Sequence, residues 1–300
     1  MENKVKVICT STGCIEYAPE RYRHLGIGII RIHFFFKGKE YLEGLDLDPD
    51  FVYKEMLNVK DTKNNLPHTA IPTYEDVAGQ FRQAIADGYK EVIVIALSSY
   101  LGGTWNFIRL VAKDFATQLK INVVDAKITC FPEGYLAVKA QEFVNQGMPT
   151  EQILQELEWI KARQEFLGID AKLDYLIYNG RLKGGKAYLG KMMSICPVVH
   201  FSHDGELVPL TNVIGQTGAL KKTCQILLKL IGNRDPKDYI LYHVYTGPSP
   251  LDKLKLIEQR FGIKTNHEDV IMSPVSGCHN GPWLAGYCLD FIRRPDEPLK

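Results

Sequence analysis

One stretch constrains the fold more than any other: an apolar run that passes through hydroxyl groups and glycines into a helical pattern. The run from Val92 to Leu97 contains no polar residue, as in a central parallel strand covered by helices on both faces. The polar and glycine residues that follow are Ser98, Ser99, Gly102, Gly103 and Thr104. Apolar residues then recur at helical spacing from Ile108 to Leu119. Such a loop exposes backbone N–H groups that suit an anionic oxygen, although a glycine turn capped by Thr104 also accounts for the pattern.

The rest of the chain extends this pattern into two α/β domains. Short apolar strands alternate with amphipathic helices up to residue 165, which predicts a mostly parallel sheet with helices on both faces. A strand restarts at Phe166, so we place an N-terminal domain at 1–165 and a C-terminal mixed α/β domain at 166–293. The segment from Ile27 to Phe36 is strongly β-prone, and we expect a hairpin with its turn at Lys37-Gly38-Lys39.

Composition excludes several classes of function. The chain of 300 residues has 36 basic and 35 acidic side chains and no long basic block, so nucleic-acid binding has no electrostatic support. No apolar run approaches the roughly 20 residues of a membrane-spanning helix, and the first residues lack a signal-peptide pattern. The seven cysteines include no Cys-x-x-Cys pair, which favours reduced thiols over disulfides or a zinc site. We therefore expect a cytoplasmic protein without a metal or cofactor.

Further polar residues lie where they could face a crevice. Thr69 falls in an extended segment between two prolines, and His279 in an expected glycine-rich turn just before the apolar run that starts at Trp283. Thr10 to Gly13 follows the first strand, either as a simple turn or as a second wall of the same crevice. The glycine- and cation-rich loop from Arg181 to Lys186, which includes Lys183, reads either as a solvated turn or as a docking or phosphate-facing loop.

Taken in order, these fragments resemble the ligand-facing motifs of the DegV family. The fragments are Pro67-His-Thr69-x-x-Pro72, Ser98-Ser-Tyr-Leu-Gly-Gly-Thr104 and His279-Asn-Gly-Pro282. The family motifs read roughly Thr-Ser-Gln-Pro, Ser-Ser-x-Leu-Ser-Gly-Thr and His-x-Gly-Pro-Gly. Asn179-Gly180-Arg181 resembles the family's Gly-Gly-Arg, and Asp204 to Pro209 resembles its hairpin. The order and separation of these fragments fit along essentially the whole chain.

The resemblance implies a non-catalytic protein that holds a long-chain fatty acid between two α/β domains. The carboxylate would lie in the interdomain crevice and the acyl chain in an apolar tunnel of the C-terminal domain. It also implies a possible fatty acid kinase partner, with Arg181 and Lys183 as candidate docking residues. The ligand-binding residues it implies are Thr69, Ser98, Ser99, Gly102, Gly103, Thr104, His279, Asn280 and Gly281.

The chain departs from these motifs, and other functions compete with fatty acid binding. Thr10-Ser11-Thr12 stands where the family has Asp-Ser-Thr, Gly102 replaces a serine, and Trp283 replaces the last motif glycine and could narrow the crevice. One competitor is an enzyme for a small carboxylated or phosphorylated substrate, with His279 as acid or base and Ser98 or Ser99 as nucleophile. Another is a relative that has lost lipid and acts through protein contacts, for example at Arg181 to Lys186.

Overall fold

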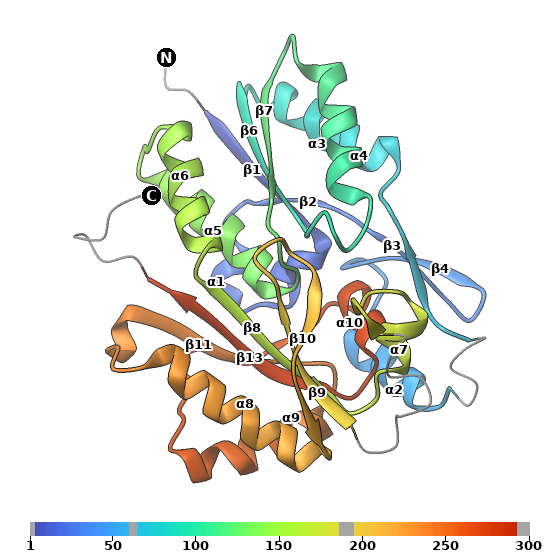
Figure 1. The fold of residues 1–300 in the computed structure, drawn as a ribbon. Helices are drawn as coiled ribbons and strands as arrows, with labels where there is room; N and C mark the ends of the chain where they lie inside the picture. The colour runs from blue at the N-terminus through green and yellow to red at the C-terminus, as the bar shows by residue number, and fades with distance from the viewer. Residues whose placement is uncertain (1–3, 60–64, 186–194, 293–300) are drawn as a thin grey trace.

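The computed structural model describes residues 4–59, 65–185 and 195–292, which form two large β-sheets, a small third sheet and the helices that cover them (Figure 1). The helices are α1 (Glu20–Arg23), α2 (Pro49–Leu57), α3 (Tyr74–Ala86), α4 (Thr104–Ala112), α5 (Phe131–Asn145), α6 (Thr150–Lys161), α7 (Asp174–Tyr178), α8 (Gln216–Ile231), α9 (Pro248–Glu258) and α10 (Pro274–Asn280). Short 3-10 turns include η1 (Ser11–Gly13), η2 (Ile15–Tyr17), η3 (Lys113–Phe115), η5 (Pro236–Asp238) and η6 (Gln259–Phe261). In these described ranges, no helix is both long and apolar enough to cross a bilayer.

The first large sheet is parallel throughout, as the sequence predicts. Its strands, in spatial order, are β2 (Gly28–Ile30), β1 (Val5–Thr10), β6 (Glu91–Ala96) and β7 (Lys120–Asp125). Every residue of β6 is buried. Val92 and Val94 pack with residues of α3 and α4 on one face, while Ile93 and Ile95 pack with residues of α5 and α6 on the other. The uninterrupted apolar run is therefore explained by burial on both faces.

The β-prone segment 27–36 forms two strands that belong to different sheets. β2 joins β1, and the chain then leaves the sheet to form β3 (His33–Phe36), which pairs with β4 (Lys39–Leu42) and β5 (His68–Ala70). At the break, Arg31 binds Glu16 through two bonds of 2.8 and 2.9 Å, and the Ile32 N–H donates to Ser11 Oγ at 3.1 Å. These side-chain partners replace the ladder bonds that would have continued the strand. The hairpin turn itself forms as expected.

The second large sheet is mixed, and α8 and α9 cover one of its faces (Figure 1). Its strands, in spatial order, are β10 (Leu207–Ile214), β9 (Ile195–Phe201), β8 (Gln164–Asp170), β13 (Leu284–Phe291), β11 (Tyr239–Tyr245) and β12 (Val270–Ile271). Only the pairing of β11 with β12 is parallel. The opposite face packs toward α5, where the Phe131 and Tyr242 rings meet edge to face at 5.4 Å.

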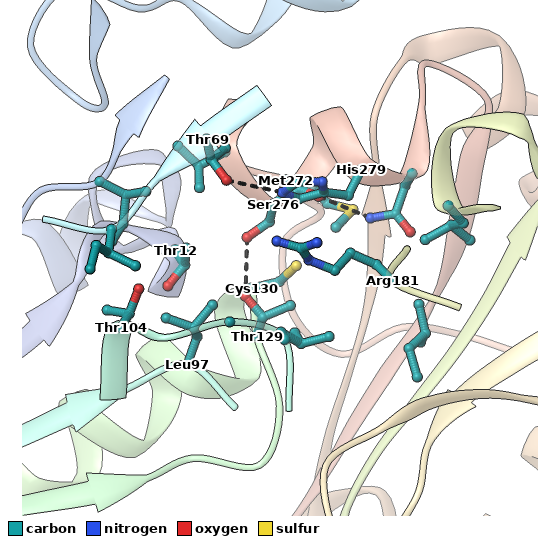
Figure 2. Close-up of a pocket in the computed structure, with 18 of the residues that line it drawn as sticks. Thr12, Thr69, Leu97, Thr104, Thr129, Cys130, Arg181, Met272, Ser276 and His279 are labelled. Carbon is teal, nitrogen blue, oxygen red and sulfur yellow. Dashed lines mark hydrogen bonds between the residues drawn. The ribbon is translucent and has the colours of Figure 1, made fainter. Parts of the chain in front are cut away.

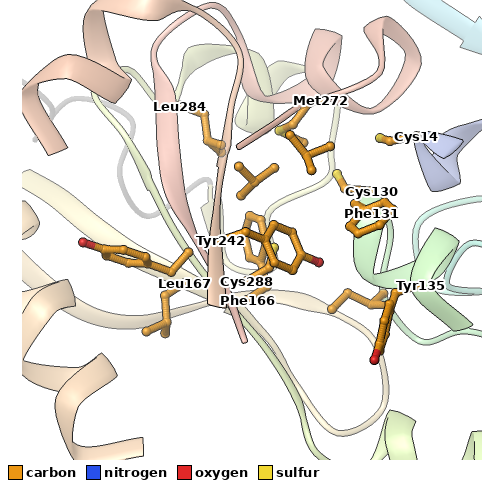
Figure 3. Packing of buried hydrophobic residues seen from close by; sticks show 14 of the residues in the cluster. Cys14, Cys130, Phe131, Tyr135, Phe166, Leu167, Tyr242, Met272, Leu284 and Cys288 are labelled. Atoms are coloured by element: carbon orange, nitrogen blue, oxygen red, sulfur yellow. The ribbon is translucent and has the colours of Figure 1, made fainter. Parts of the chain in front are cut away.

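One apolar core joins the two large sheets (Figure 3). It runs from β1 and β6 through Phe131 and Tyr135 of α5 to Phe166, Tyr242 and Cys288 of the second sheet. The two parts of the chain also meet through helices, because α2 packs against α10. The Tyr53 hydroxyl of α2 donates to the carbonyls of Met272 and Ser273 at 2.8 and 3.0 Å. The proposed division into 1–165 and 166–293 thus places the boundary inside the start of β8, and residue 293 lies outside the described ranges.

Candidate functional site

A cavity lies where the carboxyl ends of β1, β6 and β7 face α10 and the second sheet (Figure 2). It holds about 790 Å³ of space that protein atoms do not fill, part of it open to solvent. Its apolar lining residues are Ile32, Ala70, Ile71, Leu97, Leu101, Cys130, Phe166, Leu176, Phe201, Leu207, Met272 and Val275. Its polar side chains are Thr12, Thr69, Thr104, Thr129, Arg181, Ser276, His279 and Asn280.

The charge of this lining is one-sided. Arg181 points into the cavity from the end of α7, and its guanidinium is held by the Asn179 carbonyl at 2.6 Å (Figure 2). In the described part of the chain, no aspartate or glutamate lines the cavity. A largely apolar chamber with several hydroxyls and one cation suits a ligand with an apolar body and an anionic group.

Thr69 and His279 meet on one side of the cavity. β5 presents Thr69 through its pairing with β3, and His279 comes from the last turn of α10, so the expected glycine-rich turn is wrong at this position. The Thr69 Oγ1 and His279 Nε2 atoms are 3.3 Å apart. His279 Nδ1 is buried and, among the described residues, has no partner. Because a buried N–H without an acceptor is costly, we place the ring hydrogen on Nε2. Thr69 then accepts from His279, and its own hydroxyl hydrogen can be donated to a ligand.

His279 adds no positive charge to the cavity. Burial lowers the pKa of His279 to about 3, with a further lowering from the Arg181 charge. The ring is therefore neutral at physiological pH, and Arg181 supplies the positive charge of the described lining. A neutral imidazole that donates to Thr69 acts as a positioning group rather than as a counter-ion.

The N-terminus of α4 forms another part of the wall. Gly102, Gly103 and Thr104 line the cavity, and the Gly103 N-cap offers no side-chain cap to the first amides of the helix. The amides of a first turn have no partner within their own helix, so they are available to an anionic oxygen. A Cβ built on Gly102 meets nothing within 4 Å, whereas one on Gly103 comes within 3.7 Å of Ile71.

The cavity floor carries hydroxyl groups with a buried acid behind them. Thr129 Oγ1 lies 3.0 Å from Ser276 Oγ, a contact drawn in Figure 2. Thr12 donates to Glu133 at 2.8 Å, and Glu133 is fully buried on α5. Burial raises the pKa of Glu133 to about 8 although the hydrogen bonds of Thr10, Thr12 and Cys9 oppose the shift. The sequence-based reasoning missed Glu133; its signal was an isolated acid in the mostly apolar helical segment 131–138.

Comparison with known proteins identifies the family. The sequence profile of the DegV family, described as uncharacterised proteins, matches residues 4–291. The chain belongs to the DegV family. A DegV domain-containing protein of Listeria monocytogenes is 29% identical over 287 residues, which cover 95% of this chain and 98% of that protein.

Solved DegV structures share the fold. The fatty acid binding DegV family protein of Streptococcus agalactiae superposes with a TM-score of 0.85 at 24% identity, covering 97% of this chain and 99% of that one. DegV of Bacillus subtilis, a fatty acid binding protein, superposes with a TM-score of 0.77 at 25% identity, covering 96% and 99%. The two-domain α/β architecture predicted from the DegV resemblance is therefore confirmed as a fold class.

The DegV motifs do not all deliver their side chains to the cavity. Thr69, Gly102, Gly103, Thr104, His279, Asn280 and Arg181 line it. Ser98 is buried elsewhere and donates to the Gly205 carbonyl at 2.7 Å, so it anchors the turn between β9 and β10. The Ser99 amide donates to Asp125 Oδ1 at 3.2 Å, and Gly281 ends α10 with a positive φ of 86°.

Lys183 and Trp283, two further residues singled out in the sequence, do not line the cavity. Lys183 is exposed and forms an ion pair with Glu206, while Lys186 lies outside the described residues. Trp283 does not narrow the cavity, because its ring packs edge to face on Tyr175 at 5.9 Å and beneath Lys172 Nζ at 4.1 Å. Thr12 of the first strand end does line the cavity, as the second-wall interpretation of that segment required.

Proposed function

We propose that this DegV family member binds a long-chain fatty acid in the cavity. The observation that carries the proposal is the composition of the described wall: apolar surface, clustered hydroxyl and amide donors, one cation and no carboxylate. A fatty acid has the complementary chemistry, since it combines one anionic group with a long apolar chain. The solved DegV proteins of Streptococcus agalactiae and Bacillus subtilis, both named as fatty acid binding, support the same assignment.

The carboxylate is assigned to the polar part of the cavity. Thr69 offers its hydroxyl hydrogen, the first amides of α4 offer N–H groups, and Arg181 offers charge. Bonds from such donors to an ionised oxygen are roughly twice as strong as bonds between neutral groups. The ligand is therefore expected to bind in its ionised form.

The acyl chain is assigned to the apolar walls toward the second sheet. Phe166 and Phe201 meet edge to face at 5.4 Å, and Leu176 and Leu207 complete this part of the lining. Burial contributes about 0.8 kcal/mol per methylene. The roughly 14 methylenes of a hexadecanoate chain would therefore contribute roughly 11 kcal/mol before the entropy lost on binding is subtracted. The acyl chain supplies most of the binding free energy, and the polar groups of the cavity set the orientation of the ligand.

The proposed role includes no bond-making step. Ser98 uses its hydroxyl on Gly205, and His279 bonds to Thr69 rather than to a serine. A nucleophile requires a base within hydrogen-bond reach, and in the described structure neither Ser98 nor Ser99 is hydrogen-bonded to His279. From the family resemblance, we also propose that the protein presents its fatty acid to a partner kinase in the cytoplasm, with Lys183 on the docking surface.

The proposal is tested by mass spectrometry on the purified protein. Spectra are recorded under native conditions, and the released small molecules are identified after denaturation and solvent extraction. We expect a stoichiometric fatty acid in the extract. The delipidated protein is then titrated with hexadecanoate and with methyl hexadecanoate, which has the same chain but no charge.

Each outcome of this titration has a meaning. Binding of hexadecanoate at least tenfold tighter than its methyl ester supports recognition of the carboxylate. Equal binding of both ligands would refute the assigned head-group site. A ligand-free mass together with no binding of either compound would overturn the proposed function itself.

A further inference from the structure

Glu133 is a buried acid whose hydrogen-bond partners, among the residues that the structure describes, are hydroxyl and thiol groups. Its carboxyl group receives bonds from Thr12 at 2.8 and 3.0 Å, from Thr129 at 3.5 Å and from Cys9 at 3.7 Å, as well as a short bond from Thr10. No ion pair to Glu133 occurs within the described ranges. Since Thr12 and Thr129 line the cavity, the acid lies directly behind the cavity floor.

The surrounding charges all act against ionisation of Glu133. Cys9 on β1 is the nearest titratable group, and its own pKa is raised by burial and then by the Glu133 charge. Glu43, also fully buried, adds a negative charge that raises the pKa of Glu133 further. The cation of the described cavity lining is Arg181, which follows α7 and forms no bond to Glu133, and the His279 ring beside it is neutral. Glu133 therefore has no adjacent counter-charge in the described structure.

Counting hydrogens shows what the protonation of Glu133 changes. The Leu97 amide donates to Thr10 Oγ1 at 3.3 Å, so the Thr10 hydroxyl hydrogen points toward Thr12 or Glu133. When Glu133 is ionised, it only accepts, and the hydrogens of Thr10 and Thr12 are both directed at it. Thr12 then presents only oxygen lone pairs to the cavity, which repel a carboxylate.

The added proton reverses the direction of one bond. Protonated Glu133 can donate to Thr12 across the same 2.8 Å separation. The Thr12 hydroxyl hydrogen is then released from Glu133 and can be donated into the cavity. One proton on the acid thus converts one acceptor of the cavity floor into a donor.

We propose that Glu133 is a positioning residue of the cavity: in its protonated form it turns the Thr12 hydroxyl toward an anionic ligand, so that ligand binding is coupled to uptake of one proton. This inference rests on the proposed fatty acid function and assigns Glu133 a role in it. The negative charge of the bound carboxylate would in turn favour the protonated acid, because two nearby anions repel each other.

The coupling is tested by calorimetric titration of the full-length protein with hexadecanoate, supplied from a cyclodextrin carrier, between pH 7 and 9.5. For the wild type we expect the affinity to fall about tenfold per pH unit above pH 8, with proton uptake seen as a dependence of the binding heat on buffer ionisation enthalpy. Glu133→Gln should lose this pH dependence, so that its own affinity changes less than about twofold between pH 7 and 9.5. Asp290→Asn is the matched control, because Asp290 is a buried acid bonded to Gln164 at 2.6 Å outside the cavity; it should keep the wild-type profile.

A second pair of variants protects the test against misfolding of Glu133→Gln. Thr12→Val should weaken binding at pH 7 and flatten the profile, and Thr12→Ser, which keeps the hydroxyl, should restore both. Identical pH profiles for wild type and Glu133→Gln would overturn the proton coupling while leaving fatty acid binding intact. Absence of binding by the wild type at every pH would instead contradict the proposed function.

Discussion

Two buried clusters of titratable groups lie on different sides of the second sheet, and they differ in whether a counter-charge is present. His243 on β11 lies under α9, where Asp269 and Glu258 bond its two ring nitrogens at 2.7 Å each. Lys255 completes this cluster through a 2.5 Å bond to Asp269. Glu133 lies on α5 beyond the opposite face, and its partners in the described part of the chain are hydroxyl and thiol groups.

The protonation of each cluster follows from these partners. Burial alone would lower the pKa of His243, but the bonds and charges of Asp269 and Glu258 outweigh it and raise the pKa. Burial raises the pKa of Glu133 to about 8 because no cation offsets it. Burial is common to both sites, so the neighbouring charge decides which one is ionised. The His243 cluster is suited to holding structure, whereas a neutral acid behind a cavity is suited to responding to a ligand.

The largest expected effect is on stability in the charged cluster. Glu258→Ala removes the partner of His243 Nε2 and also the carboxylate to which the Tyr287 hydroxyl donates at 2.7 Å. We expect a loss of about 3–5 kcal/mol in the free energy of unfolding, measured by urea denaturation at pH 7. Glu133→Gln replaces one neutral group by another and should cost less than about 1 kcal/mol. Similar losses of unfolding free energy in Glu258→Ala and Glu133→Gln would contradict the difference between the two clusters.

The pH dependence of stability should separate the two clusters next. The pKa of Glu133 is raised on folding, so the folded state holds its proton more tightly and stability falls as the pH rises from about 4.5 to about 8. Between pH 5 and 7 this amounts to a loss on the order of 2 kcal/mol. Glu43 and Asp290, each with a pKa raised to about 7 by burial, act in the same direction.

Glu133→Gln isolates the part of this slope that belongs to one acid. In this variant, the free energy of unfolding measured with urea at pH 5, 6 and 7 should fall less with pH than in wild type. The difference between pH 5 and 7 should be on the order of 2 kcal/mol. His243 also has a raised pKa, so its contribution is complete below pH 6.5 and is lost as the pH rises through the folded-state value. An unchanged slope in Glu133→Gln would mean that the acid is already ionised in the folded protein.

A smaller effect is expected for the head-group contact. Thr69→Val removes the hydroxyl that His279 orients. We expect it to weaken hexadecanoate binding at least about tenfold at pH 7, because a hydrogen bond to a charged group contributes about 1.5–3 kcal/mol. Thr69→Ser keeps the hydroxyl and should bind like wild type. If Thr69→Val retains full affinity, the carboxylate does not lie against this pair.

The smallest predicted effect is a gain at Gly102. A side chain there enters open space, so Gly102→Ser can place a hydroxyl at the cavity where the resembled motif carries serine. We expect affinity for hexadecanoate to rise about threefold, since a hydrogen bond contributes about 0.5–1.5 kcal/mol. Gly102→Ala adds a carbon atom at the same place without the hydroxyl and should leave the affinity unchanged. A loss of binding in both variants would show that the space belongs to the ligand.

Local sequence signals were sufficient for much of the fold. Asp48 caps α2 with Pro49 following it, and Thr73 and Asp76 form a capping box at α3. These signals work because the interacting groups lie within four residues of one another. The split of the segment 27–36 could not be found this way, since it depends on Glu16 and Ser11, at least 15 residues away.

The cavity shows the same division between local and distant causes. The DegV motifs located Thr69, His279 and the start of α4, but Ser98 turned out to serve the distant turn at Gly205. Glu133 was missed because its one local signal, an acid in a mostly apolar helical segment, does not reveal which residues it contacts. Its partners Thr10 and Thr12 lie more than 120 residues earlier. An acid at this place is notable, because Thr10 itself stands where the resembled motif has aspartate.

The most direct test of the account is the ¹³C NMR spectrum of carboxyl-labelled hexadecanoate bound to the protein, recorded from pH 8 down to pH 5. Donors from Thr69, α4 and Arg181 should keep the bound carboxylate ionised, so its resonance should remain at the ionised position across this range. In Thr69→Val the resonance should begin to move toward the protonated position at a higher pH than in wild type. A bound resonance that is already protonated at pH 7, or the absence of any protein-bound resonance, would contradict the account.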